Sequence, residues 1–161
     1  MNYKIRDARK GDMRAVLGLI KELATFEKEP MAVEVTEEEL IRDGFGKSPY
    51  FKGFVAEINN EVVGTAIVFN RFSTWKGRIL HLEDLVVSEN FRNLGIGTAL
   101  LDQVVKYAYN LGVKRINWEV INWNKNAIDL YEKKGATVLH DWNVVHLSEK
   151  GINNYISKLE S

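Results

Sequence analysis

The sequence predicts an α+β domain in which helices flank one mixed, mostly antiparallel β-sheet. Segments 51–58, 61–69 and 78–87 are rich in β-branched and aromatic residues, and Asn59-Asn60 between the first two is a strong hairpin signal. Segment 78–121 contains a strand, a helix and a further strand, which requires a crossover and therefore a parallel pair. Three antiparallel strands that lead into one parallel pair make up the predicted sheet.

The segments before this sheet predict one short strand and two helices. A strand at 3–6 precedes a helix at 12–26, whose first residue is a capping aspartate and whose apolar residues recur at helical spacing. Segment 27–35 is expected to be a loop. A second short helix is predicted at 36–45, because its opening threonine is followed three residues later by Glu39 in a capping box.

The elements after the first hairpin follow from turn signals and helical spacing. Glycines end each of the two later helices, as is typical of helix C-termini. The expected elements are a connection at 70–77, a strand at 78–87, a glycine-containing loop at 88–98, a helix at 99–110, a strand at 115–121, a polar loop at 122–126, a helix at 127–134, and a closing β-ribbon that begins at Val138 and includes 143–147. Segment 148–161 shows no clear preference.

The composition fits a single domain that spans residues 1–161. The 22 Lys and Arg residues balance the 22 Asp and Glu residues, so no net charge indicates a nucleic acid or a membrane surface as partner. The absence of cysteine excludes disulfides, thiolate metal sites and a cysteine nucleophile. His81, His140 and His146 lack the spacing of metal ligands, so no metal is expected. Without an apolar signal core or a membrane span, a cytoplasmic protein is expected.

Residues 91–98 predict a site for an anion such as a diphosphate. They lie between a predicted strand and a predicted helix, where the first N–H groups of the helix have no internal partner and the helix dipole is positive. Gly95 and Gly97 allow a phosphate to approach the backbone, and Arg92 supplies a permanent charge. On its own such a glycine pattern is a weak signal, and a tight turn with a surface arginine is the alternative.

Two other phosphate-binding patterns differ from this loop. A P-loop requires Gly-Lys-Ser/Thr, whereas Gly97 is followed by Thr98 and Ala99, which excludes that pattern. A dinucleotide-binding loop requires a small residue where Leu100 stands, and glycines directly after the strand. Glu119 lies near the distance expected of a ribose-binding acid, so the dinucleotide alternative is weakened but stays open.

An ordered set of short motifs between about residues 3 and 137 resembles the GNAT superfamily of N-acetyltransferases. The loop pattern of that family, Arg/Gln-x-x-Gly-x-Gly/Ala, is met by Arg92, Gly95 and Gly97 at the expected place between the fourth strand and the third helix. Further motifs are similar to the spermidine/spermine (diamine) acetyltransferase branch, namely Leu19-Ile20-Lys21-Glu22-Leu23-Ala24, Asp43-Gly44-Phe45-Gly46, Leu82-Glu83-Asp84, Gly95-Ile96-Gly97, Trp123-Asn124 and Tyr131-Glu132-Lys133-Lys134-Gly135-Ala136.

The resemblance implies the GNAT fold, with the parallel strand pair splayed around an acetyl-CoA site, and it implies roles for the matching residues. Tyr131 would act as general acid, and Glu83 would help to remove a proton from the amine. The residues expected to hold acetyl-CoA are Leu85, Val86, Val87, Arg92, Asn93, Leu94, Gly95, Ile96, Gly97, Thr98, Asn124, Asn126 and Ala127. Those expected to surround the amine are Phe26, Glu27, Trp75, Glu83, Asp84 and Trp142. The branch forms homodimers, so a homodimer is expected.

Acetyl transfer from a thioester to an alkylamine explains the residue types in this set. An alkylammonium has a pKa near ~10.4, so a carboxylate within reach, directly or through one water, has to remove its proton. The backbone N–H of Val86 or Val87 is a candidate donor to the oxyanion, and a tyrosine can protonate the departing thiolate. Taken alone, Tyr131 is typical of a half-buried packing residue. Neighbouring strand residues face opposite ways, so Glu83 and Asp84 share a side only if the strand bulges.

Two positions differ from the members of the branch that acetylate polyamines, which carry a tyrosine where Phe26 stands and an aspartate where Ser73 stands. The lost acid weakens the case for a long polycation, and Ser73-Thr74-Trp75 is instead similar to members that acetylate thialysine, a lysine analogue. The sequence thus predicts an N-acetyltransferase for a small aliphatic amine of the thialysine, diamine or polyamine type. A protein N-terminal or lysine acetyltransferase and a non-catalytic acyl-CoA-binding module stay open as alternatives.

Overall fold

The computed structural model describes residues 2–160, and the chain divides into two compact units, Met1–Ile121 and Asn122–Ser161. The first unit contains β1 (Lys4–Asp7), α1 (Met13–Phe26), α2 (Glu37–Phe45), β2 (Lys52–Ile58), β3 (Glu61–Ser73), β4 (Gly77–Val87), α3 (Ile96–Leu111) and β5 (Ile116–Asn117), and the second contains α4 (Lys125–Lys133) and α5 (Glu149–Leu159). That residues 1–161 form a single domain stays a prediction. No helix in the described part is long and apolar enough to cross a membrane.

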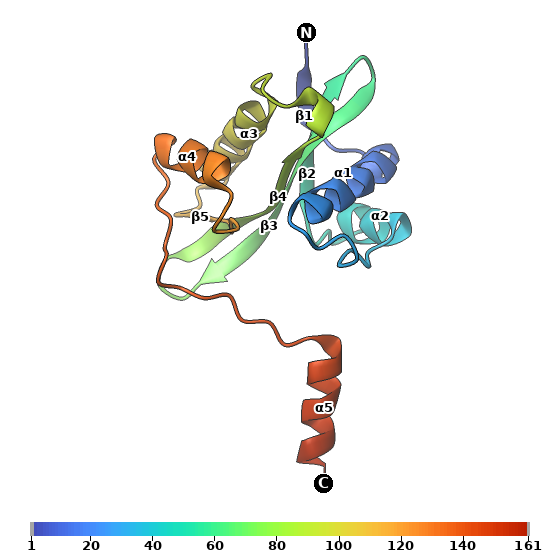
Figure 1. Ribbon diagram of the computed structural model, residues 1–161, viewed down its shortest axis with the longest axis vertical. Coiled ribbons are helices and arrows are strands. Elements are labelled where there is room, and N and C mark those ends of the chain that lie inside the picture. The colour runs from blue at the N-terminus through green and yellow to red at the C-terminus, as the bar shows by residue number, and fades with distance from the viewer. Residues whose placement is uncertain (1, 161) are drawn as a thin grey trace. The chain divides into compact units, whose positions relative to one another are not determined.

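One five-stranded sheet organises the first unit (Figure 1). Its strands follow the order β1-β2-β3-β4-β5, and all neighbours up to β4 are antiparallel. β4 and β5 run parallel, with Leu80 opposite Ile116 and His81 opposite Asn117. The hairpin turn Asn59-Asn60 between β2 and β3 has φ values of 50° and 66°, as a tight two-residue hairpin turn requires. The α+β class and the mixed, mostly antiparallel sheet are confirmed.

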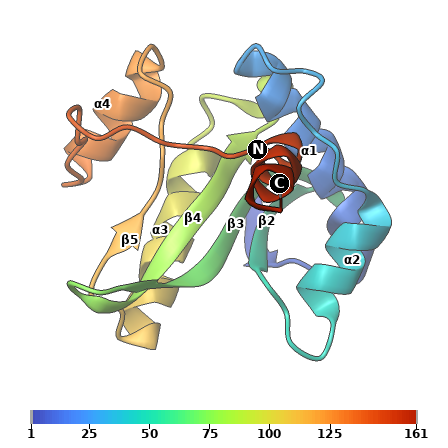
Figure 2. The same ribbon diagram turned by 90° about the horizontal axis from the view of Figure 1, so that it is seen from below.

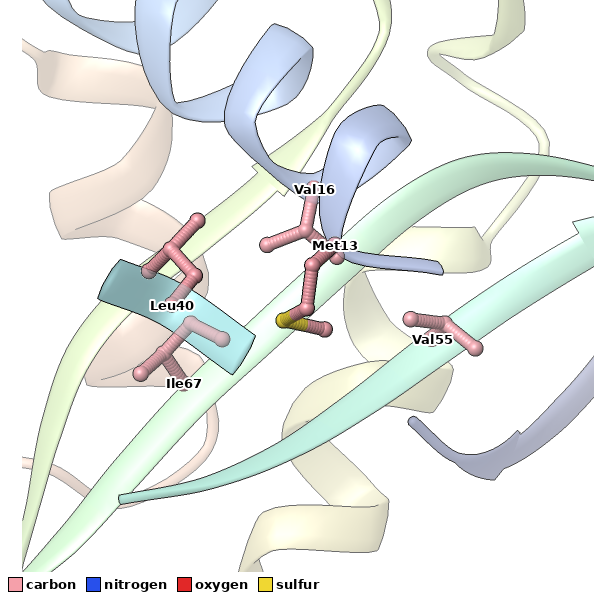
Figure 3. Packing of buried hydrophobic residues seen from close by; sticks show 5 residues of the cluster. All are labelled: Met13, Val16, Leu40, Val55 and Ile67. Carbon is pink, nitrogen blue, oxygen red and sulfur yellow. The ribbon is translucent and has the colours of Figure 1, made fainter. Parts of the chain in front are cut away.

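Helices cover both faces of this sheet within the first unit (Figures 1 and 2). α1 and α2 lie on one face, and α3 lies on the other. On the face of α1 and α2, a cluster of buried side chains brings two helices and two strands together (Figure 3). Its members are Met13, Val16, Leu40, Val55 and Ile67. Full burial of one such side chain supplies roughly 1.5–3 kcal/mol. This packing therefore holds α1 firmly on β2 and β3, and it fixes where the C-terminal end of α1 lies.

A half-buried ion-pair network ties β1 to β2 and to the start of α1. Arg6 donates to both carboxylate oxygens of Asp12 at 2.7 and 2.9 Å, and to Glu57 at 2.6 and 2.8 Å. The hydrogen bonds from Arg6 hold the pKa of Asp12 below its ordinary value. The Arg6 network is less exposed than the surface pair Arg42–Asp43, and solvent screens exposed ion pairs so that they contribute little to stability. The network is therefore the stronger constraint of the two.

Two strands differ in length from the sequence prediction. β3 continues to Ser73 instead of ending at 69, because its last residues pair with the start of β4 and shorten the connection. The strand predicted at 115–121 is wrong in extent, since β5 comprises only Ile116–Asn117. Just past this pairing β4 is irregular at Glu83, and an extra residue of this kind bends a strand away from its neighbour. The parallel pairing therefore ends after two residue pairs.

The closing β-ribbon predicted from Val138 onward, including 143–147, is wrong. The structure assigns no strand to 138–147, and α5 occupies most of the segment for which the sequence showed no preference. The residues at 143–147 have strand propensity, but a strand needs a partner edge, and an isolated two-stranded ribbon is marginal in water. α5 has its own start signal, because the side chain of Ser148 accepts a hydrogen bond from the N–H of Gly151 at 3.1 Å.

Candidate active site

A β-bulge in β4 places two consecutive acidic residues where they can serve one site. Ile67 pairs with Asp84 and Val68 pairs with Leu82, so Glu83 is an extra residue in β4. The bulge removes the alternation that would direct Glu83 and Asp84 to opposite faces. Because Asp84 is opposite Ile67, a member of the core cluster, it lies on the face that α1 covers. The bulge that the sequence argument required is present.

Glu27 at the C-terminal end of α1 joins Glu83 and Asp84 in what we call the acidic cluster. Burial, and then the negative charges of Glu83 and Glu27, raise the pKa of Asp84 to about 6. Glu27 is exposed, yet nearby atoms remove part of its water and raise its pKa as well. The C-terminal end of a helix adds partial negative charge. Together these features attract a cation.

Within the described residues, the acidic cluster lacks a lysine or arginine partner. In the same part of the chain, no group of three or more His, Cys, Asp or Glu side chains is arranged to hold a metal ion.

His81 lies beside the acidic cluster, and the sequence argument missed this placement. Its Nε2 is 3.2 Å from Oε2 of Glu83, and its ring lies against that of Phe69 with the centroids 4.8 Å apart. His81 is thus buried and packed against β3, and its imidazole also reaches Glu83. A signal was available, because residues two apart on a strand share a face and therefore place His81 next to Glu83.

Arg92 turns back onto α1 and the end of β4. Its Nε donates to the carbonyl oxygen of Val87 at 3.2 Å, and its guanidinium lies over the ring of Phe26, 5.4 Å from the centroid. Its Nη2 is 3.7 Å from Oε1 of Glu22, and the same oxygen accepts the backbone N–H of Glu89 at 2.6 Å. Glu22, which the sequence argument did not single out, thus fastens the turn between β4 and α3 to α1.

The loop before α3 has the backbone form expected of an anion site. Asn93 and Gly95 have φ values of 62° and 80°, and Gly95 is the N-cap residue of α3. Ala99 donates its N–H to Gly95 at 3.0 Å, so the N–H groups of 96–98 precede the first bond of the helical ladder. A Cβ at Gly97 would lie 3.7 Å from the side chain of Val87, which is ordinary contact. Packing therefore does not require glycine at 97.

The end of β4 has a free hydrogen-bonding edge. Ser88 donates its N–H to β3 at 2.9 Å, and backbone groups alternate in direction along a strand. The N–H groups of Leu85 and Val87 therefore point away from β3, whereas that of Val86 points towards it. β5 has ended before this point. The N–H groups of Leu85 and Val87 can thus face an extended ligand, whereas the carbonyl oxygen of Val87 already accepts a hydrogen bond from Arg92.

In the second unit, α4 carries the predicted acid and the remaining predicted contacts of acetyl-CoA. Asn124 is its N-cap residue and accepts the N–H of Ala127 at 3.3 Å, and Asn126 lies in the first turn. Tyr131 is buried on the same helix, while Trp142 is exposed and lies outside any helix or strand. The roles of Tyr131 and Trp142 in one site with the acidic cluster stay predictions.

Trp75 lies at the tip of the β3–β4 hairpin. It is 80% exposed and lies between Ser73 and Gly77, which pair across the hairpin. At about 3.3 Å per residue, β4 spans roughly 20 Å from Gly77 to Asp84. Within the first unit, the predicted amine contacts that come together are Glu27, Glu83 and Asp84, while Phe26 lies next to Glu27 in the chain and contacts Arg92. A substrate contact by Trp75 stays a prediction.

Comparison with known proteins identifies relatives over most of the chain. Residues 17–136 match the model of the Acetyltransferase (GNAT) family. The thialysine N-epsilon-acetyltransferase of Bos taurus is 40% identical over 140 residues, which cover 82% of this chain and 82% of that protein. The thialysine N-epsilon-acetyltransferase of Caenorhabditis elegans is 32% identical over 157 residues, which cover 96% of this chain and 97% of that protein.

A solved structure shows the same fold. An integron cassette protein from the mobile metagenome of V. cholerae matches with a TM-score of 0.78 at 22% identity, over 97% of this chain and 98% of that one. The GNAT fold predicted from the sequence is thereby confirmed. The family match and the two relatives show that this chain belongs to the GNAT family of acetyltransferases and is an N-acetyltransferase.

Proposed function

We propose that this enzyme transfers the acetyl group of acetyl-CoA to the primary amine of a small aliphatic amine of the thialysine or diamine type. Membership of the GNAT family implies acetyl-CoA as the co-substrate. The observation that carries the choice of acceptor is the acidic cluster of Glu27, Glu83 and Asp84, which lacks a lysine or arginine partner within residues 2–160. The names of the two relatives, both thialysine N-epsilon-acetyltransferases, support the same class of acceptor.

Two features of the first unit support the proposed site for acetyl-CoA. The N–H groups of 96–98 at the positive end of α3 suit a diphosphate, and the open edge of β4 suits the amides of the pantetheine arm. Arg92 contributes by holding the loop to Val87 and Glu22. The proposed contacts are Leu85, Val86, Val87, Arg92, Asn93, Leu94, Gly95, Ile96, Gly97 and Thr98, with Asn124, Asn126 and Ala127 from α4.

The acidic cluster supports a role in removing a proton from the acceptor. With a pKa of about 6, Asp84 is ionised at neutral pH and attracts the ammonium group. Glu83, which is more exposed, takes a proton from the ammonium through one water. The lone pair freed on nitrogen then attacks the thioester carbonyl carbon, a C–N bond forms, and the carbonyl electron pair moves onto oxygen. The N–H of Val87 on the open edge is the proposed donor to this oxyanion.

Tyr131 is the proposed acid in the second half of the reaction. As the tetrahedral intermediate collapses, the electron pair on oxygen re-forms the C=O bond, the C–S bond breaks, and its electron pair leaves with sulfur. A tyrosine hydroxyl, with an ordinary pKa of about 10, is protonated at neutral pH and can give its proton to the thiolate. The second proton on the substituted nitrogen passes to solvent, and Tyr131 regains a proton from solvent. The support for this role is the match of residues 131–136 to the family pattern.

The proposed acceptor is short because the chain offers few partners for a distant second ammonium. Phe26 stacks against Arg92 and has no hydroxyl, and Ser73 lies at the hairpin tip without a charge. Trp75 and Trp142 are proposed contacts through the family resemblance alone. The homodimer and the cytoplasmic location expected from the sequence stay predictions.

The proposal is tested by supplying acetyl-CoA with thialysine, a short diamine, spermine, lysine and a lysine peptide. Thialysine or the short diamine should give the highest kcat/KM, about tenfold or more above spermine, because each missing partner for a partly buried cation costs about 1–3 kcal/mol. The release of CoA thiol measures the rate. Spermine as the best substrate would reverse the size preference, and preference for the peptide would favour a protein acetyltransferase. Acetyl-CoA binding without thiol release would favour a binding module.

Gly97→Trp should weaken acetyl-CoA binding by tenfold or more while the melting temperature changes little. An indole at this position occupies the space in front of the first turn of α3, where the diphosphate is proposed to lie. Calorimetric titration with CoA measures the affinity. The control is Lys106→Trp, which places the same side chain on an exposed position of α3 further along the helix. Equal affinity in both variants would remove the phosphate-loop interpretation.

The kcat/KM for the amine should fall as the pH drops through about 6, because Asp84 is then protonated and no longer attracts the ammonium. Asp84→Asn should lower kcat/KM at pH 8 by about tenfold and flatten this limb of the profile. Since burial opposes ionisation of Asp84, the fold carries this cost above pH 6, and the variant should melt at a higher temperature at pH 8. Glu38→Gln on α2, an exposed acid, is the control. An unchanged acid limb would contradict the role of Asp84.

Tyr131→Phe should lower kcat by roughly a hundredfold with nearly unchanged affinity for acetyl-CoA, because the lost hydroxyl acts only in the transition state. Steady-state kinetics and a thermal melt measure the two quantities. Tyr155→Phe on α5, where the ring is exposed, serves as the control. A lowered melting temperature with normal kcat would instead identify Tyr131 as a packing residue.

A further inference from the structure

We infer that His81 is a positioning residue that holds the carboxylate of Glu83 in the orientation needed to accept a proton from the amine. The inference rests on the proposed function, in which Glu83 is the proton acceptor. Three observations carry it: the contact between the two side chains, the burial of His81 beside an exposed Glu83, and the lack of a hydrogen-bond partner for Nδ1 of His81 within residues 2–160.

The contact assigns different tasks to the two oxygens of Glu83. Nε2 of His81 lies 3.2 Å from Oε2 of Glu83. A carboxylate only accepts hydrogen bonds, and two facing lone pairs repel, so the proton of the neutral imidazole belongs on Nε2. The imidazole thereby engages Oε2 and leaves Oε1 available to the water or the ammonium. A fixed acceptor within reach is what proton transfer requires.

The difference in exposure makes His81 the rigid member of the pair. The side chain of His81 is 9% exposed and that of Glu83 is 56% exposed. His81 pairs with Phe69 on β3 and with Asn117 on β5, and the rings of His81 and Phe69 are in contact. An exposed glutamate by itself samples several rotamers. A buried imidazole held from both neighbouring strands reduces this freedom where the reaction needs one orientation.

Packing alone does not explain an imidazole at this place. Nδ1 of His81 is buried, and within residues 2–160 it has no hydrogen-bond partner. A buried polar atom without a partner costs free energy, and a phenyl ring would stack on Phe69 without that cost. Among the described residues, the polar contact recorded for the His81 side chain is the one with Glu83. The contact with Glu83 therefore explains why residue 81 is a histidine, whereas packing in the core does not.

The proposed proton transfer does not pass through His81. An N–H bond of the ammonium breaks, and its proton passes through one water to Oε1 of Glu83, where an O–H bond forms. Oε2 continues to face the Nε2–H of His81. The other charged groups of the cluster are the acids Asp84 and Glu27, and the negative charge of Glu27 helps to raise the pKa of Asp84. Glu83 then returns its proton to solvent through its exposed side.

The test compares His81→Phe, His81→Gln and His81→Asn in kinetics with a saturating level of acetyl-CoA and a varied amine. His81→Phe should lower kcat/KM for the amine about tenfold, because the carboxylate of Glu83 loses the contact that orients it. The KM for acetyl-CoA should stay unchanged. Gln places an amide N–H near the position of Nε2 and should keep most of the activity. Asn reaches only the position of Nδ1 and should behave like Phe.

A second set of variants separates this inference from the proposed function. Glu83→Gln alone should lower kcat/KM strongly, and adding His81→Phe to it should cause no further loss, because His81 acts through Glu83. Full activity of Glu83→Gln would overturn both the role of Glu83 and the inference. A large loss in Glu83→Gln, combined with normal activity of all three His81 variants or with a fully additive double variant, would overturn the inference alone. Thermal melts show whether each variant is folded.

Discussion

The β-bulge at Glu83 imposes two changes on β4, and the arrangement of the site follows from both. The extra residue brings Glu83 and Asp84 to a common side, next to the end of α1. It also lies two residues after His81, the last residue that pairs with β5, and the rest of β4 keeps an edge that β5 does not pair. A regular strand would supply neither the paired acids nor the edge, because its side chains alternate and its neighbour would continue to pair.

Features with a local signal in the sequence were predicted, and features that depend on partners were not. The turn Asn59-Asn60 and the capping box at Thr36 act within a few residues, and both occur as expected. The bulge depends on the register between β3 and β4. From the sequence alone we could say only that Glu83 and Asp84 share a side if the strand bulges. The length of β5 and the missing ribbon after Val138 depend on which edges are available. The contacts of Glu22 required the fold before they could be seen, whereas strand alternation could have placed His81 next to Glu83.

The N-terminal end of α3 and the C-terminal end of α1 create regions of opposite electrostatic potential in the first unit. The N-terminal end of α3, with unbonded N–H groups after Gly95, favours negative charge. The C-terminal end of α1 carries Glu27 beside Asp84 and favours positive charge. Asp84 remains ionised at neutral pH although burial opposes its ionisation. Keeping this charge therefore lowers the free energy of unfolding. The charge of each region thus favours one ligand: the end of α3 favours the anionic acyl donor, and the end of α1 favours the cationic acceptor.

The contacts of Glu22 on α1 link these two places. Glu22 accepts the N–H of Glu89 and lies near Arg92, while Arg92 covers Phe26 in the last turn of the same helix. The turn before the anion loop and the last turn of α1, which borders the acidic cluster, are therefore held by the same contacts. If binding of either ligand orders the contacts of Glu22 and Arg92, the second ligand binds to a site that is already ordered. Such cooperativity is reciprocal, so each ligand should tighten the binding of the other by the same factor.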